Sequence, residues 1–265
     1  MRVSVIGSGS QGNATLFEAG GTRVLVDAGI SVRALRKRLA ELQIADTGFD
    51  ALVITHSHAD HVQHAARWAK HLDVPVYASA ATRRDATALS SIRVEDIRPR
   101  GKIRFDGLTI HTVPLPHDAP QIAIIAESKA DERVALVTDL GHIPATLKHD
   151  LADCETVLLE SNHCPEQLAI APYPPFLKRR IAGERGHLSN EQAAGLIRDL
   201  PNVQRLVLMH LSQKANSPRR AKQVAMKALG GRKVELLIAK QDMPMVLPTL
   251  AQPKDQGTKQ LALAF

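Results

Sequence analysis

Residues 55–61 are Thr55-His56-Ser57-His58-Ala59-Asp60-His61, which places three histidines and one aspartate within six residues. The apolar run Ala51–Ile54 directly before them predicts a strand. Because side chains alternate along an extended chain, the first two histidines project to the same side, and a turn after Ala59 brings the aspartate and the third histidine towards them. Imidazole nitrogens and carboxylate oxygens suit cations such as Zn²⁺ and Mn²⁺. The stretch therefore predicts a metal site, and four ligands so close together favour two metals over one.

The alternative for this stretch is a histidine-rich surface loop without chemistry. A strand before it and a helix after it, as the pattern predicts here, are the context in which such a motif binds metal. We therefore expect the metal site.

The composition is that of a globular protein with one large core. The chain has 265 residues, of which 44% are hydrophobic. It has no apolar run long enough for a membrane span and no signal-peptide pattern at its start, which predicts a cytoplasmic protein without membrane contact. The two cysteines, Cys154 and Cys164, have the spacing of neither a redox pair nor a zinc site, so we expect buried, unreactive thiols.

The charge of the chain favours an acidic partner. The net charge is +7 and the isoelectric point is about 9.6. A nucleic acid would fit this balance, and an ordinary solvated basic surface is the alternative. Aromatic residues make up only 3% of the chain, so we expect any nucleic-acid contact to be mainly with phosphates.

The N-terminal third begins as a strand meander. Short β-branched runs at 3–6, 14–18 and 23–27 are separated by glycine-rich turns. The segment Gly7–Gly12 matches the dinucleotide fingerprint G-x-G-x-x-G, but that fingerprint requires a helix to start there. Because a strand is predicted instead, we expect no nicotinamide or flavin site.

The rest of the chain mixes helices and strands, which predicts an α/β (α+β) fold of two mixed sheets flanked by helices. Predicted helices cover 31–42, 62–72, 190–200 and 218–229. Further predicted strands cover 74–78, 92–97, 108–113, 121–126, 133–138, 156–159, 205–209 and 234–238.

A two-metal site needs more ligands than residues 55–61 supply. His117 follows the predicted strand 108–113, Asp139 ends the strand 133–138, and His210 ends the strand 205–209. Singly, each could be a cap or turn residue. Strand ends are where open mixed sheets place their sites, so together they predict the missing ligands.

In this order, these motifs resemble those of the metallo-β-lactamase superfamily, whose fold is a four-layer αββα sandwich. The resemblance implies that His56, His58 and His117 bind one divalent metal ion, either Zn²⁺ or Mn²⁺. It also implies that a second ion is bound by Asp60, His61 and His210, with Asp139 bridging both. Asp27 matches the early aspartate that supports the histidine loop in this superfamily.

Four further segments resemble one branch of the superfamily, the YycJ/WalJ-type exonucleases: Gly7–Asn13, Leu159–His163, Gly186–Asn190 and His210–Ser212. The likeness covers residues 1 to about 247. It departs from the branch at Cys164, where an acidic residue is usual, and at 214–216, where paired asparagines are common. Gly186-His187 and the strand-end histidine are also similar, more distantly, to ribonuclease Z.

The resemblance implies a two-metal-dependent phosphodiesterase, and above all a DNA exonuclease of replication or repair. A metal-bridging hydroxide would be the nucleophile, oriented by Asp60 and Asp139. His187 is the candidate that donates a proton to the leaving oxygen, with helix capping as its alternative role.

Other polar residues are candidates for supporting roles. Ser8, Ser10 and Asn13 offer donors for a terminal phosphate, although a plain tight turn would use them as well. Arg180, in a basic stretch just before His187, could also contact phosphate. A separate pair, Glu160 and His163, is expected to hold the metal ligands in place by hydrogen bonding.

A polar linker, followed by an apolar hexapeptide at 260–265, forms the last part of the chain. We predict a hydrolase domain over 1–249 and a flexible segment over 250–265. The ending resembles the short peptide by which bacterial DNA-processing enzymes bind the sliding clamp, with Gln260, Leu261, Leu263 and Phe265 as anchors. An apolar tail that packs back on the body is the alternative.

Two other functions remain open at this stage. One is a small-molecule hydrolase of the same fold, either a cyclic phosphodiesterase or a glyoxalase II-type thioesterase. The other is a metal-stabilised binding module, which the complete ligand set disfavours. The sequence predicts no oligomeric state.

Overall fold

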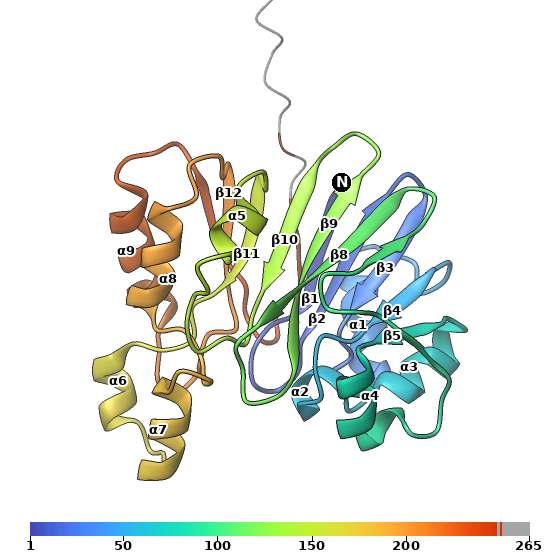
Figure 1. The fold of residues 1–265 in the computed structure, drawn as a ribbon, viewed down its shortest axis with the longest axis horizontal. Coiled ribbons are helices and arrows are strands. Elements are labelled where there is room, and N and C mark those ends of the chain that lie inside the picture. The colour runs from blue at the N-terminus through green and yellow to red at the C-terminus, as the bar shows by residue number, and fades with distance from the viewer. Residues whose placement is uncertain (248–249, 251–265) are drawn as a thin grey trace, which may run out of the picture.

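Two seven-stranded sheets packed face to face form the centre of the computed structural model, which describes residues 1–247 and 250 (Figure 1). The first sheet contains, in spatial order, β14 (Met245–Leu247), β1 (Arg2–Gly7), β2 (Ala14–Ala19), β3 (Thr22–Val26), β4 (Ala51–Val53), β5 (Val76–Ala78) and β6 (Val94–Asp96). The second contains β13 (Glu235–Ile238), β12 (Arg205–Met209), β11 (Thr156–Glu160), β10 (Arg133–Val137), β9 (Gln121–Ser128), β8 (Leu108–Leu115) and β7 (Lys102–Arg104).

The two sheets follow the same plan. In the first, β14, β1, β2 and β3 pair antiparallel, and β3 to β6 pair parallel. In the second, β7 to β10 pair antiparallel, and β10 to β13 pair parallel. Each sheet is therefore mixed, as the sequence predicts.

Helices cover the outer face of each sheet (Figure 1). The first sheet carries α1 (Val32–Glu41), α2 (Ala59–Val62), α3 (Ala65–Leu72), α4 (Ala80–Asp85) and a short 3-10 helix, Thr87–Leu89. The second carries α5 (Leu147–Leu151), α8 (Asn190–Arg198) and α9 (Pro218–Leu229). Two short helices, α6 (Pro165–Ile170) and α7 (Pro175–Ala182), project at the end where α2 lies. The four-layer αββα architecture is thus confirmed.

Period-two burial along the strands builds three hydrophobic layers. In β3, Val24 and Val26 pack between the sheets, while Leu25 packs under the helices of the first sheet. In β11, Leu158 packs between the sheets, while Leu159 packs under the helices of the second. Strands buried on both faces are continuous apolar runs, which is why they were predictable.

The predicted helix over 62–72 is wrong at its start. The structure has two helices there, α2 and α3, which are interrupted at residues 63–64. The His64 amide donates to the Ala28 carbonyl at 3.0 Å, and the Ala28 amide donates to the His61 carbonyl at 2.6 Å. These contacts with the segment after β3 divert the backbone from one continuous helix.

Several short elements were not predicted: β7, β14 and the four helices α4 to α7. Each has eight residues or fewer, which leaves little room for a periodic pattern. None of the helices in the described part of the chain has both the length and the apolar character needed to cross a membrane. The clamp-binding residues predicted at 260–265 lie outside the described residues, so the division at residue 249 stays a prediction.

Candidate metal centre

The predicted ligands converge at one end of the sandwich, and both sheets contribute to them. Residues 56–61 follow β4 of the first sheet, and His117, Asp139 and His210 follow β8, β10 and β12 of the second. Four groups have ligand atoms within 4.8 Å of one another: His56, His58 and His117; Asp60, His61 and His210; His56, His61 and Asp139; and Asp139, Glu160, His187 and His210. The structure therefore brings together all seven residues that the sequence singled out as ligands.

Three of the strand-end residues have an unusual backbone. Asp27, Asp139 and His210 have φ angles of 64°, 60° and 54°, in the left-handed region. Such a conformation costs a residue with a side chain on the order of 1–3 kcal/mol. Hydrogen bonds offset that cost, because the Asp139 amide donates to Glu160 Oε1 at 3.2 Å and the His210 amide donates to Ser8 Oγ at 2.8 Å.

Close backbone packing also shapes the histidine loop. A Cβ atom at Gly29 would lie 1.8 Å from the Asp60 carbonyl oxygen. Only glycine fits there, so the segment after β3 can lie directly against residues 58–61.

Three of the candidate histidines use Nδ1 to bond to the protein. The closest partners are Asp27 Oδ2 for His61 at 2.7 Å, Glu160 Oε1 for His210 at 3.0 Å, and the Gly186 carbonyl for His117 at 3.0 Å. Because each acceptor requires a proton on Nδ1, the other nitrogen, Nε2, has the lone pair when the imidazole is neutral. That lone pair is the atom that a metal ion would bind.

The remaining two histidines are held in the same manner. His56 Nδ1 lies 3.1 Å from Thr55 Oγ1, and His58 Nε2 lies 3.1 Å from Asp118 Oδ1. Thr55 and Asp118 were not predicted as supporting residues. Thr55 bonds in turn to Asp27, and Asp118 also lies 2.6 Å from Arg180 Nε.

Two observations indicate that this arrangement fits metal ions. His56 Nε2 and Asp139 Oδ2 are buried and make no hydrogen bond within the described residues. His117 Nε2 and His58 Nδ1, the nitrogens left without a proton, lie only 3.2 Å apart. Lone pairs that face each other, and buried acceptors without donors, are unfavourable in themselves and favourable around a cation.

The electrostatics of the site point the same way. Burial lowers the pKa of His56 well below its usual value, which favours the neutral imidazole that binds metal. Burial alone would raise the pKa of Asp139, but His210 and His61 hold it well below its usual value, so the carboxylate stays ionised. Burial alone would lower the pKa of His61 and His210 too, but Asp139 and the neighbouring carboxylates raise it well above its usual value, so the site favours positive charge at these positions. The donor set combines imidazole nitrogens with buried carboxylates, which suits Zn²⁺ or Mn²⁺.

Glu160 links several parts of the site. Its carboxylate is completely buried and lies 3.0 Å from Nδ1 of both His187 and His210, and it accepts the Leu188 amide at 2.8 Å. Burial alone would raise the pKa of Glu160, but His187 lowers it to about 2. Glu160 thus lies where the sequence predicted a supporting residue.

The side chain of His163, predicted to play a similar part, makes no hydrogen bond or ion pair with any of the ligands in the described structure. Burial lowers its pKa to about 4, and its Nδ1 is buried without a hydrogen bond. His163 packs beside the N-terminus of α8 through a backbone bridge with Ser189.

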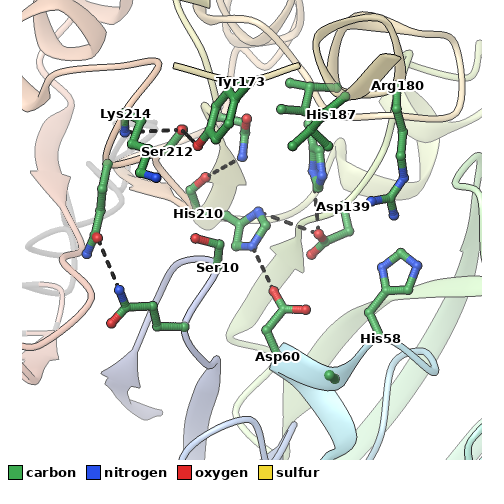
Figure 2. Close-up of a pocket in the computed structure, with 16 residues that line it drawn as sticks. Ser10, His58, Asp60, Asp139, Tyr173, Arg180, His187, His210, Ser212 and Lys214 are labelled. Atoms are coloured by element: carbon green, nitrogen blue, oxygen red, sulfur yellow. Dashed lines mark hydrogen bonds and ion pairs between the residues drawn. The ribbon is translucent and has the colours of Figure 1, made fainter. Parts of the chain in front are cut away.

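A cavity of about 550 Å³ opens over the candidate ligands (Figure 2). Figure 2 shows His187 next to Asp139 and His210, with Asp60 and His58 below them and Tyr173 above His210. The residues lining it are Ser10, Gln11, His58, Ala59, Asp60, Asp139, Asn162, Tyr173, Leu177, Arg180, Ile181, His187, His210, Ser212, Gln213 and Lys214.

Of the four residues predicted to bind phosphate, Ser10 and Arg180 line this cavity, and Ser8 and Asn13 do not. Ser8 is 2% exposed, and its hydroxyl accepts the His210 amide. The Asn13 side chain accepts the Gly9 amide and donates to Asp60. Both residues therefore hold the loops of the site, because the turn after β1 directs their side chains inward.

Several residues that line the cavity were not predicted, among them Tyr173, Leu177 and Lys214. The first two belong to the projecting segment of α6 and α7. Apart from the basic stretch that contains Arg180, its signal in the sequence is the run Pro172-Tyr173-Pro174-Pro175, which predicts a rigid turn but does not show where that turn lies in the fold.

Comparison with known proteins agrees with the geometry. Residues 22–211 match the family described as the Beta-lactamase superfamily domain. Exodeoxyribonuclease WalJ of Streptococcus pneumoniae is 31% identical over 223 residues, which cover 81% of this chain and 83% of WalJ. Ribonuclease Z of a Mycobacterium species is 26% identical over 249 residues, which cover 79% of this chain and 84% of the relative.

The fold has close neighbours among solved structures. The metallo-β-lactamase fold protein YhfI of Bacillus subtilis superposes with a TM-score of 0.71 at 18% identity, over 93% of this chain and 99% of YhfI. At that identity the likeness concerns the fold alone. The domain match and the 31% identity to WalJ show that the chain belongs to the metallo-β-lactamase superfamily, in the branch of the WalJ-type proteins, and is a metal-dependent hydrolase.

Proposed function

We propose that the chain is a two-metal-dependent phosphodiesterase, and specifically a DNA exonuclease of replication or repair. The observation that carries this proposal is the arrangement of the imidazoles. Five histidines each have one nitrogen bonded to the protein, and the same histidines gather in overlapping groups whose ligand atoms lie within 4.8 Å of one another, which together form one centre. That centre lies on one side of an open cavity rather than in a closed structural site. The WalJ relative is named an exodeoxyribonuclease, and the positive charge of this chain suits the same polyanion.

We assign one Zn²⁺ or Mn²⁺ ion to His56, His58 and His117. The second ion is assigned to Asp60, His61 and His210, with Asp139 between the two. The ligand atoms of each trio lie within 4.8 Å of one another, as do those of His56, His61 and Asp139. When bound, two such cations supply an activated water at neutral pH and offset the charge that develops on a phosphate.

The residues around the cavity have separate roles in this proposal. Asp60 and Asp139 line the cavity and would accept hydrogen bonds from the attacking water. His187 also lines it and has Nδ1 bonded to Glu160. In its imidazolium form, with a proton on both ring nitrogens, Nε2 would pass its proton to the leaving oxygen and Nδ1 would keep its bond to Glu160. Ser10 and Arg180 line the cavity and would contact phosphate, for which Arg180 would first have to release its ion pair with Asp118.

Digestion of end-labelled linear DNA by the metal-loaded protein tests the proposal. Metal-dependent loss of nucleotides from one end is expected, and His58→Ala should abolish it. His71→Ala is the matched control, because His71 is a partly exposed histidine that lies outside the cavity and pairs with Asp46. Failure of fully metal-loaded protein to cut DNA or RNA would instead favour the small-molecule hydrolase.

The clamp interaction is a proposal from the sequence alone, since residues 251–265 lie outside the described structure. A flexible tether ending in Gln260, Leu261, Leu263 and Phe265 would raise the local concentration of the enzyme at DNA that carries a clamp.

A further inference from the structure

The cavity has two chemically different walls. The strand ends and the histidine loop contribute the polar residues Asp60, Asp139 and His210, whereas the projecting segment contributes the largely apolar Tyr173, Leu177 and Ile181 together with Arg180. None of the other phenylalanine, tyrosine or tryptophan residues in the described part of the chain lines this cavity. The one ring that does so, that of Tyr173, lies beside Ser212 and above His210 in the close-up, with Asp60 and His58 farther away (Figure 2).

The chain holds Tyr173 in a fixed position. Prolines at 172, 174 and 175 fix their own φ angles and restrict the residues before them. The Tyr173 hydroxyl lies 3.4 Å from Ser212 Oγ, and the ring packs on a small cluster of Leu168, Ala171 and Ala215. A ring that is ordered before binding loses little conformational entropy when it contacts a ligand.

A cationic group accompanies the ring. Lys214 Nζ lies 5.6 Å from the centre of the Tyr173 ring and also lines the cavity. Lys214 is exposed and forms no ion pair with the residues that the structure describes. Its charge is therefore available to a phosphate beside the ring.

A nucleotide matches the lining of the cavity, because it has a charged phosphate at one end and a base with apolar faces at the other. We propose that Tyr173 forms a subsite for the terminal nucleobase of a single strand, on which the base stacks while its phosphate faces the candidate metal ligands and Lys214 binds the neighbouring phosphate. The inference rests on the proposed nuclease function. Because every base has a π face, the subsite accepts all four bases similarly.

The alternative is that Tyr173 only fills space between α6 and the loop after β12. A purely structural ring would stabilise the segment without distinguishing substrates that have a base from those that lack one. Comparison of two substrates therefore separates the two roles.

The test uses the full-length, metal-loaded protein and single-stranded oligonucleotides whose terminal residue is either thymidine or an abasic tetrahydrofuran, placed at each end in turn. For the wild type, we expect KM to be roughly 5- to 100-fold lower for the end with a base. Tyr173→Leu should lose that preference by raising KM for thymidine ends alone. Tyr173→Phe, which keeps the ring, should retain it.

Phe176→Ala is the matched control, because Phe176 is an aromatic residue of the same segment that is 65% exposed and does not line the cavity. It should behave as the wild type. Equal KM values of the wild type for the two substrates, or an equal loss on both in Tyr173→Leu, would overturn the subsite while leaving the exonuclease intact. Absence of any nucleic-acid cleavage by the wild type would overturn both proposals.

Discussion

Glu160 and His210, which are 50 residues apart in the chain, meet in a buried contact of 3.0 Å between Glu160 Oε1 and His210 Nδ1. The same oxygen lies 3.0 Å from His187 Nδ1. One carboxylate therefore sets the orientation of a predicted metal ligand and of the predicted proton donor.

Glu160→Gln should lower metal affinity by about 10- to 100-fold, because the amide no longer offers a carboxylate to both imidazoles. Metal content after dialysis against a graded series of chelator concentrations measures this loss. Glu191→Gln makes the same change at a partly exposed position and should leave the metal content unaltered. Equal retention of metal by the two variants would show that Glu160 does not orient the ligands.

Addition of metal should stabilise the folded protein. A ligand that binds only the native state at 100 times its Kd contributes about 2.7 kcal/mol, which corresponds to a rise in Tm of roughly 5–10 °C for a chain of this size. Thermal unfolding of chelator-treated protein, with and without added Zn²⁺ or Mn²⁺, provides the measurement. His56→Ala should reduce the rise, whereas an identical rise in that variant would place the bound metal elsewhere.

Cys154 should resist alkylation while the protein is folded. Burial raises the pKa of its thiol to about 12, and the side chain is 1% exposed, so neither the thiolate nor access is available at pH 8. Mass spectrometry after treatment with iodoacetamide should find this cysteine unmodified in buffer and modified in denaturant.

The same shift predicts a dependence on pH. The pKa of Cys154 is higher in the folded than in the unfolded chain, where it is about 9.0. Its contribution to stability is therefore complete below about pH 9 and decreases as the pH rises towards 12. Cys154→Ala should lose less stability than the wild type over that interval. Parallel pH profiles of the two proteins would contradict the prediction.

Deletion of residues 260–265 should leave DNA hydrolysis unchanged and abolish binding to a bacterial sliding clamp. The deletion removes every predicted anchor and none of the residues that line the cavity. Surface plasmon resonance on immobilised clamp compares the two forms, and undiminished affinity of the shortened chain would exclude the peptide.

The parts of the site that were predictable are those with a local cause. Residues 56–61 form a motif through their spacing alone, and Asp139 and His210 follow strands whose apolar runs are long and buried on both faces. Asp118 had no such signal, because its role depends on His58, which is 60 residues away in the chain and meets it only in the folded protein. A contact between residues so far apart in the chain leaves no signal in the local sequence pattern.

The inward orientation of Ser8 and Asn13 was also not predictable, because it too depends on contacts between residues far apart in the chain. Their polarity and the neighbouring glycines are equally typical of a phosphate-binding loop and of a structural turn. The hydrogen bond from the His210 amide to Ser8 Oγ, which joins residues separated by 202 positions, decides between the two. Similarly, the helix is interrupted after Val62 because His61 and His64 bond to the backbone of Ala28, which belongs to another segment.

The seven candidate ligands are divided between the sheets, with four of them after β4 and three after strands of the second sheet. Metal ions held in this way would span the seam of the sandwich. A molecule whose sheets had docked out of alignment could not bind its full complement, whatever its content of secondary structure. Metal stoichiometry would therefore serve as an assay of correct assembly, and could separate properly folded protein from well-formed but misdocked material in a preparation.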